Sequence, residues 1–212
     1  MLNEDECYQH LRNQIRTGTL MPNERLVEMD LSKGLGAGRA AVRTALARLE
    51  QEGLVERQRH RGARVRLISE AEAIEILEVR SALEPIIAYH AAVNASKADI
   101  AVLSSVLDDM ESFHNANDWI RYSDGNARLH QTLIRIARHN TATRILDTLH
   151  SQSVRFQYRM MLSRGRIENS LAEHRAIVRA VSDGKPEEAK QAMREHLSRV
   201  VITLRELFKR ST

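Results

Sequence analysis

The chain has 212 residues, of which 42% are hydrophobic and 28% are charged, so it can form one large or two modest domains with packed cores. Aromatic residues make up only 4%, which argues against a single-strand nucleic-acid binder that relies on base stacking. The single cysteine, Cys7, excludes an intrachain disulfide and favours a reducing compartment. No leader opens the chain and no apolar run approaches a membrane span, so we expect a cytoplasmic protein without membrane contact.

Helical spacing of apolar residues, followed by a strand-like pattern, predicts a small N-terminal domain over residues 1–68. Cys7, Leu11 and Ile15 are four residues apart, which predicts a helix over about 4–17. A short helix over 28–33 ends at Gly34 and Gly36, and a longer helix over about 38–52 ends at Gly53.

The hydrophobic period changes from 3.6 to 2 after Gly53. Two strands are expected over 54–59 and 63–67, with their tip at 60–62. Helix, short helix, glycine turn, helix and hairpin is the order of a winged helix-turn-helix, a fold that binds DNA.

Basic side chains are concentrated in the second half of this domain. Residues 39–66 hold eight arginines against three glutamates, a net charge of +5, whereas the whole chain carries +4. A local basic cluster of this kind is typical of a surface that contacts phosphates. The alternative is a solvated basic face formed by Arg39, Arg43 and Arg48, because most charge runs are no more than that.

The remainder of the chain, residues 69–212, shows only helical periodicity. Ser69 and Glu72 form a capping box at its start. The fold class is therefore mainly α, with the winged helix-turn-helix followed by an all-α bundle of six to seven helices, expected at about 70–93, 97–114, 118–138, 142–163, 170–183 and 186–209.

Three histidines lie on the apolar sides of three different predicted helices, namely His130, His174 and His196. Each one alone is best explained as a neutral, hydrogen-bonded core residue. Together they could converge on a metal ion, because helical bundles build metal sites from facing helices. Imidazole suits zinc, nickel, copper or iron.

The N-terminal pieces resemble the GntR family of bacterial repressors over about 55 residues in register. The matching pieces are IRTGTLMPNERLVE (15–28), LS (31–32), LG (35–36), GRAAVRTALARLEQEGLV (38–55) and RGARV (61–65). The resemblance implies that DNA contacts come from the recognition helix and from the wing, which are Arg39, Arg43, Arg48, His60, Arg61, Gly62 and Arg64. Gly38 stands where family members usually carry a capping Ser or Thr, so that hydroxyl contact is missing.

Residues 70–209 resemble the FCD ligand-binding domain, through EVRSALEP (78–85), NARLH (126–130), SLAEHRAI (170–177) and AMREHL (192–197). The resemblance implies a metal site formed by Asn126, His130, His174 and His196, with zinc or nickel as the divalent ion. Many members carry Asp at the position of Asn126, and a neutral amide is a weaker ligand than a carboxylate. A small carboxylic acid would act as effector, with Arg80, Arg155 and Tyr158 as candidates to clamp it.

We therefore expect a homodimeric transcriptional regulator, most simply a repressor, that binds double-stranded operator DNA and is not an enzyme. Two alternatives stay open at this point. A three-histidine site could serve a metal-dependent hydrolase, although Glu173 and Glu195 point about 100° away from the adjacent histidines. A non-specific architectural DNA binder would show no preference for an operator.

Overall fold

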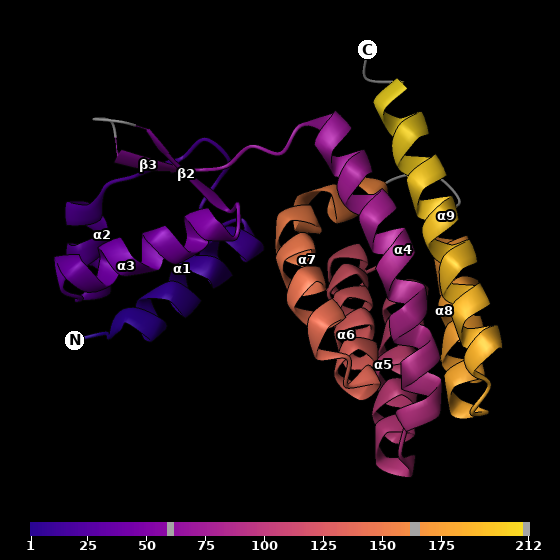
Figure 1. Cartoon of the computed structure of the whole chain (residues 1–212). Coiled ribbons are helices and arrows are strands. Elements are labelled where there is room, and N and C mark those ends of the chain that lie inside the picture. The colour runs from indigo at the N-terminus through magenta and orange to yellow at the C-terminus, as the bar shows by residue number, and fades with distance from the viewer. Residues whose placement is uncertain (59–61, 162–165, 210–212) are drawn as a thin grey trace. The chain divides into compact units, whose positions relative to one another are not determined.

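The computed structural model describes residues 1–58, 62–161 and 166–209, and Figure 1 shows that they are mostly helical, as the sequence predicts. The chain divides into two compact units. One comprises Met1–Ser69 with His150–Arg155, and the other comprises Glu70–Leu149 with Phe156–Thr212. Among the described residues, no helix combines the length and apolar content that a membrane crossing requires.

The first unit is a winged helix-turn-helix, which confirms the predicted architecture. Its elements are α1 (Glu4–Thr17), β1 (Arg25–Leu26), α2 (Glu28–Leu35), α3 (Arg39–Gln51), β2 (Val55–Gln58) and β3 (Gly62–Val65). The three strands form an antiparallel sheet in the order β1-β3-β2. The two-residue strand β1 was not expected from the sequence, because a segment this short carries no alternation of its own.

Local signals set the ends of these helices. Asn3 and Glu6 form a capping box that starts α1, and Gly18 ends it in the left-handed conformation. Gly36 adopts φ 60° in the turn between α2 and α3, a conformation that glycine enters without strain. The apolar side chains of α1 and α3 then share one core, in which Leu11 and Leu49 are fully buried.

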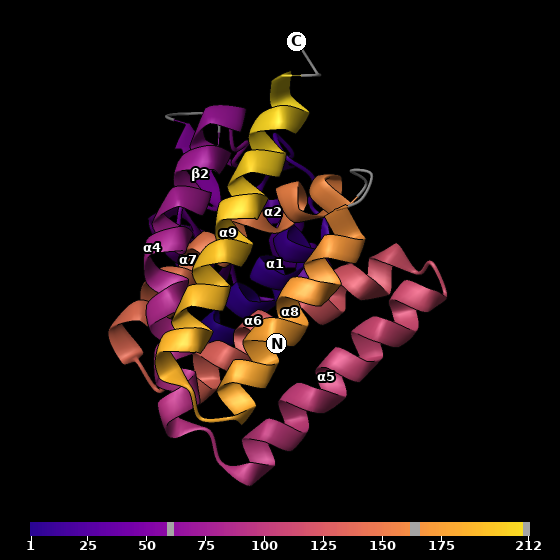
Figure 2. The same ribbon diagram turned by 90° about the vertical axis from the view of Figure 1, so that its right-hand side faces the viewer.

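The second unit is a helical bundle formed by α4 (Glu70–Asn94), α5 (Lys97–Asn115), α6 (Trp119–Ala137), α7 (Asn140–Met161), α8 (Arg166–Ser182) and α9 (Pro186–Lys209). Helices α4 and α9 lie side by side along most of their length, as both views show (Figures 1 and 2). Helix α9 also packs on α8, and α6 packs on α4 and α5. Residues from α4, α6, α8 and α9 therefore meet in one core.

A capping box fixes the start of α5. Ser96 caps the helix by accepting from the backbone N–H of Asp99, whose carboxylate accepts from Ser96 in return. Arg135 on α6 donates to the other oxygen of Asp99 at 3.0 Å. These hydrogen bonds, led by those from Ser96, hold the pKa of Asp99 below its usual value.

Helix α8 begins at Arg166, four residues before the start predicted from the sequence. Ser170, the residue at which the sequence analysis starts this helix, lies inside it and is buried. Its hydroxyl lies 3.3 Å from Nδ1 of His174, one turn further along. Ser170 and Glu173 have the spacing of a capping box, but in the structure Ser170 makes a buried polar contact instead.

Candidate functional site

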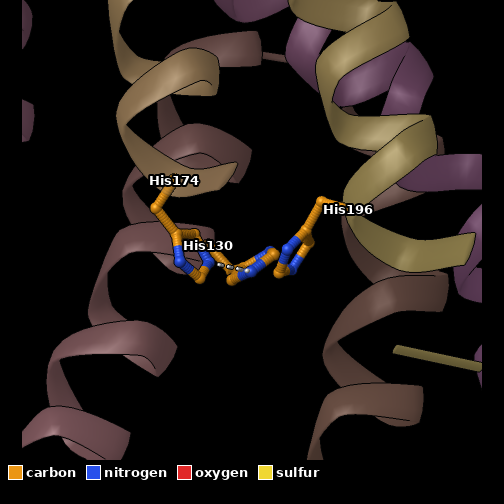
Figure 3. A group of neighbouring side chains, drawn as sticks. All are labelled: His130, His174 and His196. Atoms are coloured by element: carbon orange, nitrogen blue, oxygen red, sulfur yellow. Dashed lines mark hydrogen bonds between the residues drawn. The ribbon is translucent and has the colours of Figure 1, made fainter. Parts of the chain in front are cut away.

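Three imidazole rings converge in the core of the second unit (Figure 3). His130 comes from α6, His174 from α8 and His196 from α9, and each is at most 3% exposed. One ring nitrogen from each histidine lies within 4.8 Å of the corresponding atoms of the other two. The Nε2 atoms of His130 and His174 are 3.4 Å apart. The structure thus brings together the three histidines that the sequence placed on apolar faces.

A separate partner holds the Nδ1 atom of each ring. Nδ1 of His130 lies 2.6 Å from Oε2 of Glu84, and Nδ1 of His196 lies 2.7 Å from Oε2 of Glu173. A carboxylate can only accept at these distances, so both histidines carry their proton on Nδ1. Nε2 is then the ring nitrogen that would bind a metal ion.

Two arginines hold the carboxylates in turn. Arg80 donates from Nε to Oε1 of Glu84 at 2.6 Å, and Arg199 donates from Nη1 to Oε1 of Glu173 at 3.3 Å. The Arg80–Glu84 pair is almost fully buried, with side chains 4% and 2% exposed. The result is two chains of the same kind, each running from arginine through glutamate to histidine.

The donor set fits a divalent metal ion. Tetrahedral zinc with Zn–N bonds of 2.0–2.1 Å separates its ligand nitrogens by about 3.3 Å, close to the distance between His130 and His174. Metal-bound histidines usually donate their second ring N–H to a carboxylate, as His130 and His196 do here. Asn126 is buried on α6, one turn before His130.

The first unit presents a different surface at the start of α3. Arg39 and Arg43 are exposed and lie one turn apart, on the same side of the helix. Gly38 is the N-cap and offers no side-chain hydrogen bond, as its lack of a hydroxyl requires. Arg43 directs its guanidinium to Glu28 on α2, with Nη2 at 3.2 Å from Oε2.

Arg48, further along α3, is engaged within the unit. It pairs with Asp5 and stacks over the ring of Tyr8, with its guanidinium carbon 3.9 Å from the ring centre. Tyr8 in turn donates from its hydroxyl to Glu52. Burial and this hydrogen bond raise the pKa of Tyr8 to about 12. These contacts join α1 to the far end of α3.

The wing hairpin joins β2 and β3 in antiparallel register, with Gln58 opposite Gly62. Gly62 has φ 85°, which a side chain would strain. Arg64 on β3 pairs with Glu56 on the neighbouring strand. His60 and Arg61, two further candidates from the sequence, lie outside the described residues.

Two family profiles match different parts of the chain. The profile described as "Bacterial regulatory proteins, gntR family" matches residues 3–65, and the profile "FCD domain" matches residues 75–199. The chain belongs to the GntR family of transcriptional regulators, in the group with an FCD domain. Members of this family are DNA-binding regulators and not enzymes, so the hydrolase alternative has no support.

Relatives of this GntR regulator span almost the whole chain. The uncharacterized HTH-type transcriptional regulator YdhC of Bacillus subtilis is 26% identical over 91% of this chain and 87% of its own. The HTH-type transcriptional repressor GlaR of Escherichia coli is 24% identical over 90% of each chain. The solved structure of E. coli McbR/YncC has the same fold, with a TM-score of 0.83 at 17% identity, covering 98% of this chain and all of that one.

The remaining candidates from the sequence concern the effector. Arg80 lies in α4 of this GntR regulator, against Glu84, whereas the side chains of Arg155 and Tyr158 lie outside the part of the chain that the structure describes. Sequence reasoning missed Glu84, Ser170 and Glu173. A signal did exist for the first, because Arg80 and Glu84 occupy positions where the helical period places core residues.

Proposed function

We propose that this regulator is a repressor whose affinity for its operator is controlled by a small carboxylate, bound at a metal ion in the FCD domain. The observation that carries the proposal is the convergence of His130, His174 and His196 with their Nδ1 atoms already engaged. One relative, the HTH-type transcriptional repressor GlaR of E. coli, supports the choice of repressor over activator.

We infer that His130, His174 and His196 hold the ion through Nε2, with Asn126 as a fourth, weaker ligand. Imidazole ligands favour zinc or nickel over magnesium or calcium. The ion would supply a Lewis-acidic position to which a carboxylate oxygen can bind. Glu84 and Glu173 orient two of the rings, and Ser170 lies against the third.

The effector clamp proposed from the sequence is Arg80 with Arg155 and Tyr158. Arg80 is 3% exposed and connects to the centre through Glu84, which itself contacts His130. We therefore propose that Arg80 influences the bound acid by fixing Glu84 and, through it, the His130 ring.

The DNA contacts are assigned to the start of α3 and to the wing. Arginine can fork onto O6 and N7 of guanine in the major groove, which suits Arg39 and Arg43. Arg48, Gly62 and Arg64 are assigned to backbone or minor-groove contacts, together with His60 and Arg61. Of these, Arg48 and Arg64 already have acidic partners within the unit, so they would contribute less than Arg39.

We further propose a homodimer that places one winged unit on each half of a pseudo-palindromic operator. A stripe of exposed apolar residues on α4 supports a helical interface. Its members, spaced three, four and seven residues apart, are Val79, Ala82, Ile86 and Val93.

The test combines DNA and ligand binding in the full-length protein. An operator is first selected from random DNA with wild-type protein, and its dissociation constant is then measured with zinc, with zinc plus acetate, succinate or citrate, and with EDTA. At least one acid should weaken operator binding fivefold or more in the presence of zinc, and none should do so in EDTA. The double variant His174→Ala/His196→Ala should bind DNA normally, bind no zinc and ignore the acids.

Two results would contradict the proposal. If the double variant retained wild-type zinc content by elemental analysis, the ligand assignment would be wrong. If Arg43→Ala bound the operator at wild-type strength while circular dichroism showed an intact fold, the recognition-helix assignment would fail.

A further inference from the structure

We propose that Glu28 is a specificity-determining residue for DNA. Its ion pair with Arg43 disfavours the approach of a phosphate, whereas Arg43 can leave the pair to bind guanine. The inference rests on the assignment of Arg43 as a DNA contact. Its basis is the geometry of this one ion pair, which joins the first turn of α2 to the first turns of α3.

The two side chains meet through the forked edge of the guanidinium. Nε of Arg43 lies 3.3 and 3.4 Å from the two carboxylate oxygens of Glu28, and Nη2 lies 3.2 Å from Oε2. Arginine uses this same kind of paired N–H edge to read guanine. Glu28 therefore occupies the donors that a base would need.

Arg39 provides the contrast within the same helix. It is exposed, and within the residues that the structure describes it forms no ion pair. The first turn of α3 contains no acidic residue. The two arginines at the start of this helix thus have different electrostatic surroundings, and only Arg43 is matched by a carboxylate.

Glu28 is suited to stay where it is when DNA approaches. It is the first residue of α2, where the helix dipole stabilises a negative charge, and its side chain is 30% exposed. The Arg43 side chain is 60% exposed, and exposed ion pairs are weak enough to exchange partners. Arg43 can therefore leave Glu28 for a better acceptor.

The nature of that acceptor decides the outcome. A phosphate that approaches Arg43 also approaches the carboxylate of Glu28, and the two negative charges repel. Guanine offers neutral acceptors at O6 and N7, so it binds the guanidinium without that repulsion. Glu28 should therefore reduce binding to random DNA, which depends on phosphates, more than binding to the operator.

The experiment compares Glu28→Gln with Glu50→Gln in the full-length protein, without added metal or acid. Glu50 pairs with Arg57 at 3.3 Å near the other end of α3, so this control makes the same charge change in the same unit. Dissociation constants are measured for the selected operator and for a random duplex of equal length, over a range of salt concentrations.

Glu28→Gln should bind random DNA three- to tenfold more tightly, with a smaller gain on the operator, so that the ratio of the two affinities falls. The salt dependence on random DNA should steepen by about one phosphate contact. Glu50→Gln should leave the ratio unchanged. In an Arg43→Ala background, the effect of Glu28→Gln on the ratio should disappear.

An unchanged or increased ratio for Glu28→Gln would overturn the proposal, and so would an effect that persists without Arg43. If Arg43→Ala itself leaves operator binding intact, the underlying contact assignment fails. If Arg43→Ala weakens binding but Glu28→Gln does not alter the ratio, only the role of Glu28 fails.

Discussion

Replacing Glu84 by glutamine tests the buried chain that runs from Arg80 to His130. One carboxylate oxygen accepts from Arg80 at 2.6 Å and the other lies 2.6 Å from Nδ1 of His130, with all three side chains at most 4% exposed. Glutamine keeps the volume and one oxygen, but its NH₂ group must face one of the two donors. One of the two hydrogen bonds is therefore lost.

The magnitude follows from burial and charge. A hydrogen bond to a charged group contributes about 1.5–3 kcal/mol, and breaking a buried ion pair by removing one partner costs about 3–5 kcal/mol. Because Glu84→Gln retains one bond, we expect the free energy of unfolding to fall by about 2–4 kcal/mol in metal-free protein. The single tryptophan, Trp119, begins α6, so its fluorescence during urea denaturation reports on the second unit at fixed protein concentration.

A zinc titration against a competing chelator provides an independent readout. Loss of a partner that orients a metal ligand typically lowers affinity 10- to 100-fold. The matched control is Glu111→Gln, whose carboxylate pairs with Arg175 at a more exposed position, where the pair side chains are 35% and 52% exposed. The control should cost less than about 1 kcal/mol and leave zinc affinity unchanged. If both variants behaved alike in both assays, the orienting role of Glu84 would be refuted.

Three further perturbations follow from other contacts. Asp99→Asn should lower the thermal midpoint at pH 7, and the difference from wild type should shrink as the pH falls below about 3.9, the unfolded-state pKa. Hydrogen bonds led by those from Ser96 lower the pKa of Asp99, so its stabilisation is present above the unfolded-state pKa and disappears as pH falls through the folded-state value. Tyr8→Phe should cost about 1 kcal/mol through loss of the Glu52 hydrogen bond, and a 295 nm titration of wild type should show one tyrosine ionising only near pH 12. Ile86→Arg should convert dimer to monomer in light scattering, and a dimer of undiminished stability would argue against the α4 interface.

Local signals in the sequence were enough to predict the main elements. The spacing of Cys7, Leu11 and Ile15 predicts a helix that the structure confirms as α1, and the change of period after Gly53 predicts the hairpin. The side on which a histidine lies is also a local property, because the apolar neighbours at i+3 and i+4 define it. The predicted helix faces of the three histidines therefore carried information about the site before any fold was known.

Contacts between helices were beyond the reach of this reasoning. Glu173 precedes His174 by one residue, so its side chain is turned about 100° away from that ring. Only the packing of α9 on α8 brings His196 to the other side, where its Nδ1 meets Glu173 at 2.7 Å. The strand β1 likewise forms because its backbone pairs with β3. Arg25 lies opposite Arg64, nearly forty residues further along the chain.

The charges around the three histidines favour an anionic ligand. Arg80 offsets Glu84 and Arg199 offsets Glu173, so the two ion pairs beside the histidines carry little net charge. The Arg80–Glu84 pair is buried, and a buried pair seldom stabilises a fold more than apolar side chains would, so its presence in a bundle core favours a role in ligand binding. A divalent cation adds two positive charges that Glu84 and Glu173, already paired with arginines, do not compensate, and the neutral amide of Asn126 removes none. Zinc should therefore bind more tightly with acetate present than with a neutral buffer alone, and equal affinity would show that the effector does not contact the ion.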